Sequence, residues 1–132
     1  MFSFFKKIPH YDQSEVLSLM TARLGSLYYQ PISDSVFDQY YALYQKAYAY
    51  EKDGKIDRAL DYYFYIILNY TAIGTVYYDR PAIVLEKLKR YEEAAVITQM
   101  HVNLAKHPNA KLDLEGAEKR LQRLQKKYMR NE

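Results

Sequence analysis

Residues 46–60, KAYAYEKDGKIDRAL, decide the fold of this chain. Apolar side chains recur at steps of three and four residues from Val36 up to this stretch, and again from Ile56 to Tyr70. Between the two series lies Gly54, and glycine is the residue that most often ends a helix. Because so short a loop turns the chain back on itself, the stretch predicts two antiparallel helices joined as a hairpin.

A second copy of this pattern lies further along the chain. Ala47 and Ala59 in the first copy correspond to Ala82 and Ala94 in the second, an offset of 35 residues. Where two helices cross closely only a small side chain fits, so Ala47 is expected to face Ala59, and Ala82 to face Ala94. Each hairpin alone would leave an apolar face uncovered, so this period predicts hairpins that stack on one another.

The segments 46–60 and 81–94 resemble tetratricopeptide repeats. The resemblance covers about residues 40–105 and implies an all-α fold, in which antiparallel helical hairpins stack as a short right-handed superhelix of about six helices. Lys89 departs from the family pattern, because glycine is common at that position. The chain is then a single domain with an N-terminal tail and capping helix (1–35), repeat one (36–70), repeat two (76–106) and a C-terminal capping helix (110–132).

Helical periodicity predicts the remaining elements. Outside the first hairpin, helices are expected over residues 13–28, up to residue 89, over 91–105 and over 111–129. Asp79-Arg80-Pro81 can begin the helix that ends at residue 89, or re-cap it. Ser33 and Ser35 can cap the helix that follows them. Only residues 72–77 have a mild strand character, so no sheet is expected.

The resemblance implies a concave groove lined by the first helix of each hairpin. Carried over by position, its partner-binding residues are Tyr41, Tyr44, Tyr48, Lys52, Ile83 and Lys87, and Glu51, Val76, Asp79 and Glu86 line the same groove. Three tyrosines at steps of three and four residues form an aromatic row that can hold a peptide or a partner helix by apolar burial and hydroxyl hydrogen bonds. The alternative is that the first helix or a second copy of the chain covers this row.

The composition argues against an enzyme. The absence of cysteine excludes disulfides and thiolate chemistry, and it fits a reducing cytoplasm. His10, His101 and His107 lack the spacing of metal ligands, and four isolated glycines form no phosphate-binding loop. We therefore expect no catalytic residues, no metal and no cofactor. No apolar run approaches the ~20 residues that span a bilayer, so we expect no membrane partner.

Two other functions follow in order of preference after binding of a protein or peptide partner. The chain is a self-associating structural protein, a homo-oligomer, if the last helix or the tyrosine face pairs with its own copy. It is a weak nucleic-acid binder if the basic residues of the last helix contact phosphates; these are Lys119, Arg120, Arg123, Lys126, Lys127 and Arg130. Nucleic acid is the least favoured partner, because Glu115 and Glu118 lie among these cations and lysines commonly complement a helix C-terminus.

The first seven residues, MFSFFKK, have their aromatic residues before their lysines and lack the long apolar stretch of an export signal. We expect them to be a flexible tail or a strap docked over the first helix, in preference to a membrane contact.

Overall fold

Six α-helices make up the computed structural model, which describes residues 7–130 and the side chains of 7–128. The helices are α1 (Gln13–Ser26), α2 (Asp34–Lys52), α3 (Ile56–Asn69), α4 (Val76–Lys87), α5 (Tyr91–Ala105) and α6 (Leu114–Arg130). The described residues contain no strand, which confirms the predicted all-α class. Within the same part of the chain, no helix is both long enough and apolar enough to cross a membrane.

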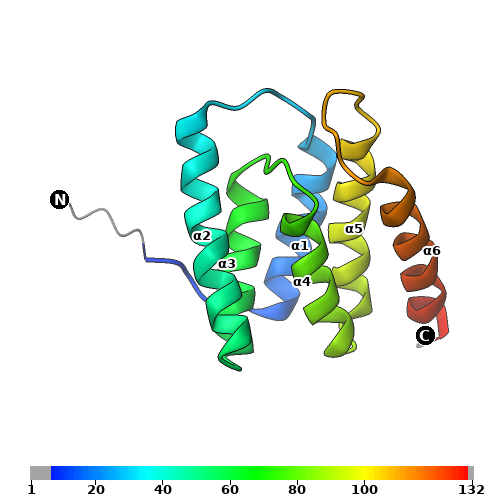
Figure 1. Ribbon diagram of the computed structural model, residues 1–132. Helices are drawn as coiled ribbons and strands as arrows, with labels where there is room; N and C mark the ends of the chain where they lie inside the picture. Colours follow the sequence, from blue (N-terminus) through cyan, green and yellow to red (C-terminus); the bar gives the residue numbers. More distant parts are fainter. Residues whose placement is uncertain (1–6, 131–132) are drawn as a thin grey trace.

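The second to fifth helices form two hairpins that lie side by side. α2 packs against α3, α4 packs against α5, and the hairpins meet where α3 contacts α4 (Figure 1). α6 packs against α5 and ends the array. The first helices of the two hairpins lie on one face of the molecule, and α1 lies on the opposite face. This arrangement leaves α2 at one edge of the array.

Small side chains occupy buried positions in both hairpins. Ala47, Ala59, Ala82 and Ala94 are completely buried, with no exposed surface. Tyr63 lies in the same core as three of them. A larger side chain at any of these positions would have to displace its neighbours, because protein interiors are close-packed.

The turns of the two hairpins have the same backbone conformation. Gly54 has φ 80° and Lys89, 35 residues later, has φ 62°. In the first turn the Lys55 N–H donates to the Tyr50 carbonyl over 2.9 Å, and in the second turn Arg90 makes the equivalent bond over 2.9 Å. Position 89 therefore requires the left-handed conformation that glycine adopts most easily, even though lysine occupies it.

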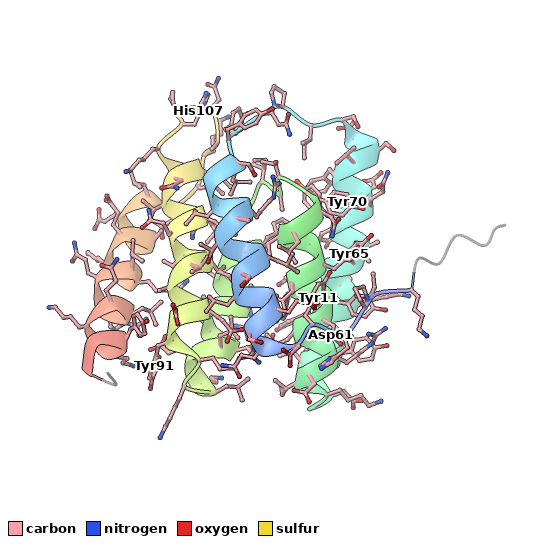
Figure 2. All side chains as sticks on the ribbon, turned by 180° about the vertical axis from the view of Figure 1, so that it is seen from behind. Tyr11, Asp61, Tyr65, Tyr70, Tyr91 and His107 are labelled. Carbon is pink, nitrogen blue, oxygen red and sulfur yellow. The ribbon has the colours of Figure 1, made fainter. Side chains whose placement is uncertain are left out.

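The helix predicted as an N-terminal cap does not sit at the end of the array. α1 packs against α3 and α5, the second helices of the two hairpins, and Figure 2 shows it in front of them when the molecule is seen from behind. Val16 and Met20 are fully buried in this contact, and Arg23 Nε donates to the Ile67 carbonyl over 3.3 Å. Residues 27–33 are long enough to carry the chain from this face over the hairpins to α2.

A buried carboxylate on α3 fixes the chain just before α1. Asp61 is 3% exposed and accepts hydrogen bonds from the Tyr11 N–H (3.1 Å) and His10 Nδ1 (3.1 Å) (Figure 2). Arg58 donates to the Ile8 carbonyl over 3.0 Å, and Ile8 is buried. Burial, together with Tyr65 and Asp61, raises the pKa of Tyr11 to about 12. Residues 8–11 therefore dock on α3. The predicted tail or strap comprises residues 1–7, and residues 1–6 of it lie outside the described residues.

α4 begins at Val76, the first residue of the predicted repeat two, so Asp79-Arg80-Pro81 lies inside the helix and does not begin it. Tyr77 and Tyr78 in its first turn are 4% and 2% exposed. Pro81 has no N–H to give to the Tyr77 carbonyl, so one helical hydrogen bond is missing. Burial of the two tyrosine rings provides the stabilisation that extends the helix upstream of the proline.

Candidate functional site

A row of near-parallel aromatic rings runs along α2. Ring centroids are 5.8 Å apart for Phe37 and Tyr41, 6.5 Å for Tyr41 and Tyr44, and 6.1 Å for Tyr44 and Tyr48. The rings align because steps of four, three and four residues return to the same face of a helix. We call these four residues the aromatic strip. Phe37 was not among the predicted site residues, although it stands four residues before Tyr41 in the same series.

Most of the aromatic strip is open to solvent. Phe37, Tyr41 and Tyr48 are 39%, 42% and 39% exposed, whereas Tyr44 is half-buried. The Tyr44 ring meets Tyr77 of α4 edge-on, with centroids 5.3 Å apart. Burial raises the pKa of Tyr44 and of Tyr77. A tyrosine hydroxyl is already protonated at neutral pH at its ordinary pKa, so both groups can donate hydrogen bonds. The strip thus combines apolar surface with hydroxyl groups.

An ion pair beside the strip joins the two hairpins. Glu51 of α2 pairs with Arg80 of α4 and accepts a hydrogen bond from the Tyr63 hydroxyl over 2.7 Å. The Arg80 guanidinium lies 5.6 Å from the Tyr48 ring centroid, and Lys52 Nζ lies 5.4 Å from it. The predicted groove residue Glu51 is therefore neutralised within the molecule. Arg80 was not among the predicted groove residues.

The predicted partner-binding residues divide into two groups. Tyr41, Tyr44, Tyr48 and Lys52 line a shallow hollow of about 890 Å³ over α2. Ile83 and Lys87 are not among its lining residues: Ile83 is half-buried on α4, and Lys87 is exposed at the end of that helix. The structure thus brings together the α2 residues and leaves the two α4 residues apart from this hollow.

The acidic residues of the predicted groove on α4 form ion pairs with residues of α6. Asp79 pairs with Arg120, and Glu86 pairs with Arg123 and with Lys127, whose Nζ lies 2.7 Å from the carboxylate. Burial alone would raise the pKa of Glu86, but the hydrogen bonds from Lys127 and Arg123 outweigh it and lower the pKa. Three of the cations proposed to contact nucleic acid therefore fasten α6 to α4.

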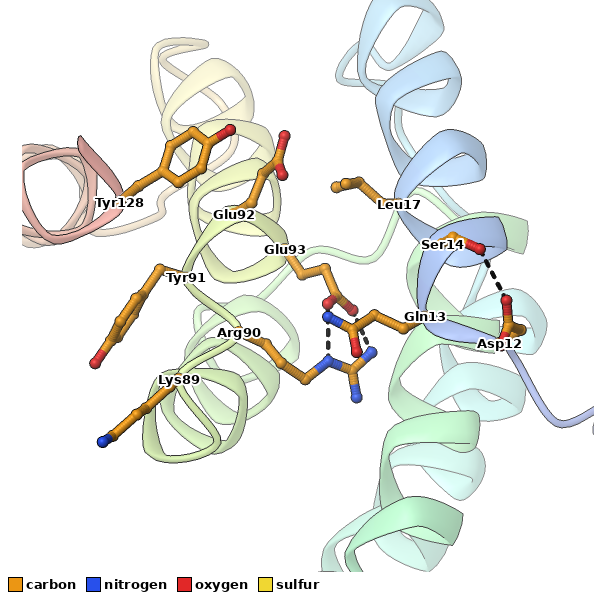
Figure 3. Close-up of a pocket in the computed structure, with 10 residues that line it drawn as sticks. All are labelled: Asp12, Gln13, Ser14, Leu17, Lys89, Arg90, Tyr91, Glu92, Glu93 and Tyr128. Carbon is orange, nitrogen blue, oxygen red and sulfur yellow. Dashed lines mark hydrogen bonds and ion pairs between the residues drawn. The ribbon is translucent and has the colours of Figure 1, made fainter. Parts of the chain in front are cut away.

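A second hollow, of about 680 Å³, lies between the start of α1 and the turn before α5. Figure 3 shows that Arg90 and Glu93 form an ion pair on its wall, and that the Ser14 hydroxyl donates to Asp12 over 2.9 Å. The hollow is lined by both acidic and basic side chains, so much of their charge cancels. The described residues contain no group of three or more histidine or carboxylate side chains arranged to hold a metal ion.

His101 of α5 is a buried imidazole with neither ring nitrogen hydrogen-bonded. It stacks on Tyr78, with ring centroids 5.4 Å apart, and its Nδ1 lies 3.8 Å from Asp79. Burial lowers the pKa of His101; the attraction of Asp79 opposes this effect, and the charge of Arg120 adds to it. The imidazole is therefore neutral in the native chain at neutral pH.

Acid is expected to destabilise the chain through His101. The unfolded chain binds a proton there near pH 6.5, whereas the native chain binds it only at lower pH. Between these two values the unfolded state holds more protons, so the free energy of unfolding falls as pH falls, by up to about 1.4 kcal/mol per pH unit. Urea unfolding between about pH 7.5 and pH 5 measures the slope. His101→Phe keeps the stacked ring without the titration, and an unchanged slope in that variant contradicts the prediction.

The arrangement on α2 can bury apolar surface and donate hydrogen bonds, which are the requirements for holding another polypeptide. Comparison with known proteins adds no further assignment: no family model, curated protein or solved structure matches this chain.

Proposed function

We propose that this chain is a non-enzymatic protein-interaction module, a tetratricopeptide-like stack of two hairpins that binds a helix or peptide of a partner on the aromatic strip. The observation that carries the proposal is the exposure of Phe37, Tyr41 and Tyr48 along one face of α2, while α1 packs on the opposite side of the molecule. Described helices contact the strip mainly at Tyr44, where Tyr63 of α3 and Tyr77 of α4 pack against its ring. The matching turns at Gly54 and Lys89 support the repeat. The lack of cysteine supports a cytoplasmic location.

Tyrosine suits this role on physical grounds. A ring half exposed in the free chain gains from further burial, and it loses little conformational freedom because it has only two side-chain torsions. Tyrosine is accordingly enriched among residues that dominate binding energies. Nucleic-acid binding by α6 is less favoured, because Arg120, Arg123 and Lys127 are already paired with carboxylates of α4.

Replacing Tyr41 and Tyr48 together by alanine is expected to reduce capture of the partner from native cell extract at least about tenfold. Both side chains are well exposed, so circular dichroism should show unchanged helicity. Tyr28→Ala is the matched control, since Tyr28 is 67% exposed and lies on the connection between α1 and α2. Equal capture by the double variant and by the Tyr28 control would remove the aromatic strip as the binding surface.

A further inference from the structure

The aromatic strip has opposite charges at its two ends. Asp34 is the first residue of α2, and Lys52 is the last. They are 18 residues apart, which is about five helical turns, so they lie on the same side of α2. Asp34 stands seven residues before Tyr41 and Lys52 four residues after Tyr48, so both lie close to the face of the rings. Both are exposed, and neither forms an ion pair with another described residue. The face therefore runs from an acidic end, across aromatic rings, to a basic end.

Such a face is complementary to itself when reversed. If a second α2 lies antiparallel on the first, Asp34 of each copy approaches Lys52 of the other, and the midpoint of these positions falls next to Tyr44. A two-fold axis there repeats every contact twice. A parallel arrangement would instead place like charges together. The geometry points to α2 of a second copy of this chain as the helix that binds the aromatic strip, antiparallel and about a two-fold axis.

The surroundings of the strip favour this occupant. Glu51, the residue before Lys52, is neutralised by Arg80 within the same chain, so this acid does not oppose an approaching helix. The steps of four, three and four residues between Phe37 and Tyr48 match the spacing with which paired helices interlock. α2 is 19 residues, or roughly 28 Å, long and lies at the edge of the array, where no other described helix obstructs it.

This inference rests on the proposed function of the strip as a helix-binding surface, and charge reversal tests the register. In sedimentation velocity over a hundredfold concentration range reaching about 200 μM, the full chain is expected to change from monomer to dimer. Lys52→Glu alone should raise the dimer dissociation constant at least about tenfold, because symmetry turns two attractive pairs into two repulsive ones. Adding Asp34→Lys to that variant should return the constant to within about threefold of the original value. Lys106→Glu, an exposed reversal after α5, is the matched control.

The outcomes separate this inference from the proposed function. A strict monomer at ~200 μM overturns the inference, as does a dimer that ignores the charge reversals. If the chain is a monomer and replacing Tyr41 and Tyr48 still reduces capture of a partner from extract, the strip binds a different protein. The proposed function then stands. A dimer that forms equally well with both tyrosines replaced overturns the inference, and equal capture by that variant overturns the proposed function. Circular dichroism of each variant confirms that the fold is kept.

Discussion

Replacing Tyr78 by alanine is expected to lower the free energy of unfolding by about 3–5 kcal/mol. Tyr78 is 2% exposed, and its ring stacks on His101 between α4 and α5. Its hydroxyl donates to the Ala72 carbonyl over 2.6 Å, which ties down the connection between the hairpins. Alanine removes the whole ring and leaves a cavity that the surrounding helices fill only in part. A loss of this size is a large part of the stability of an ordinary domain.

Equilibrium urea unfolding measures this loss, and Tyr78→Phe is its matched control. Phenylalanine keeps the ring but leaves the Ala72 carbonyl without its donor, so a smaller loss of about 1–3 kcal/mol is expected. The difference between the two variants isolates the packing of the ring. Equal losses would show that the hydrogen bond, and not the packing, holds this part of the core.

The second large effect is expected from enlarging two of the buried alanines. Ala47→Leu in α2 and Ala82→Leu in α4 each insert a bulky side chain at a position with no exposed surface. Overpacking costs about 1–3 kcal/mol at each site, and the two sites lie in different hairpins, so their effects should add to about 2–6 kcal/mol. Thermal and urea unfolding of the double variant measure the sum.

The chain offers a matched control for this double substitution. Ala42 and Ala49 lie on the exposed side of α2, so replacing both by leucine adds the same number of atoms without entering the core. A change within about 0.5 kcal/mol per site is expected. If the buried and exposed pairs destabilise equally, the buried alanines are not sites of close helix packing.

Local sequence signals predicted the helices of the hairpins well. α3 and α5 begin at Ile56 and Tyr91 as the periodicity indicates, and Ser33 accepts the expected capping hydrogen bond from the Val36 N–H. These features depend on residues within one or two helical turns, where spacing and capping chemistry act directly. The offset of 35 residues between Gly54 and Lys89 likewise corresponds to two matching turns in the structure.

The sequence did not predict contacts between segments that lie far apart along the chain. The apolar residues of α1 show that one side of the helix is buried, but they do not show which helices bury it. α1 was expected at the end of the array, and it packs instead on α3 and α5. Asp61 meets Tyr11 across 50 residues of chain, and no local pattern marks such a pair. Asp79-Arg80-Pro81 left two interpretations open, a helix start or a re-capping point, and the burial of Tyr77 places the start of α4 upstream of Pro81.

The candidate site was predicted in part, for a similar reason. Tyr41, Tyr44 and Tyr48 share one helix, so their spacing alone places them together. Ile83 and Lys87 were assigned by correspondence between two helices, and how helices sit side by side depends on packing that spacing does not describe. The ion pair between Glu51 of α2 and Arg80 of α4 also depends on how two helices pack side by side.

The position of α1 has a consequence for how the molecule comes apart. In a linear array each hairpin contacts only its neighbours, and one end can open while the other stays folded. α1 contacts the second helix of both hairpins, so opening either hairpin also breaks contacts that support the other. Slow amide protons of α3 and α5 should therefore exchange with deuterium in one cooperative event, with a single opening free energy shared by the two helices.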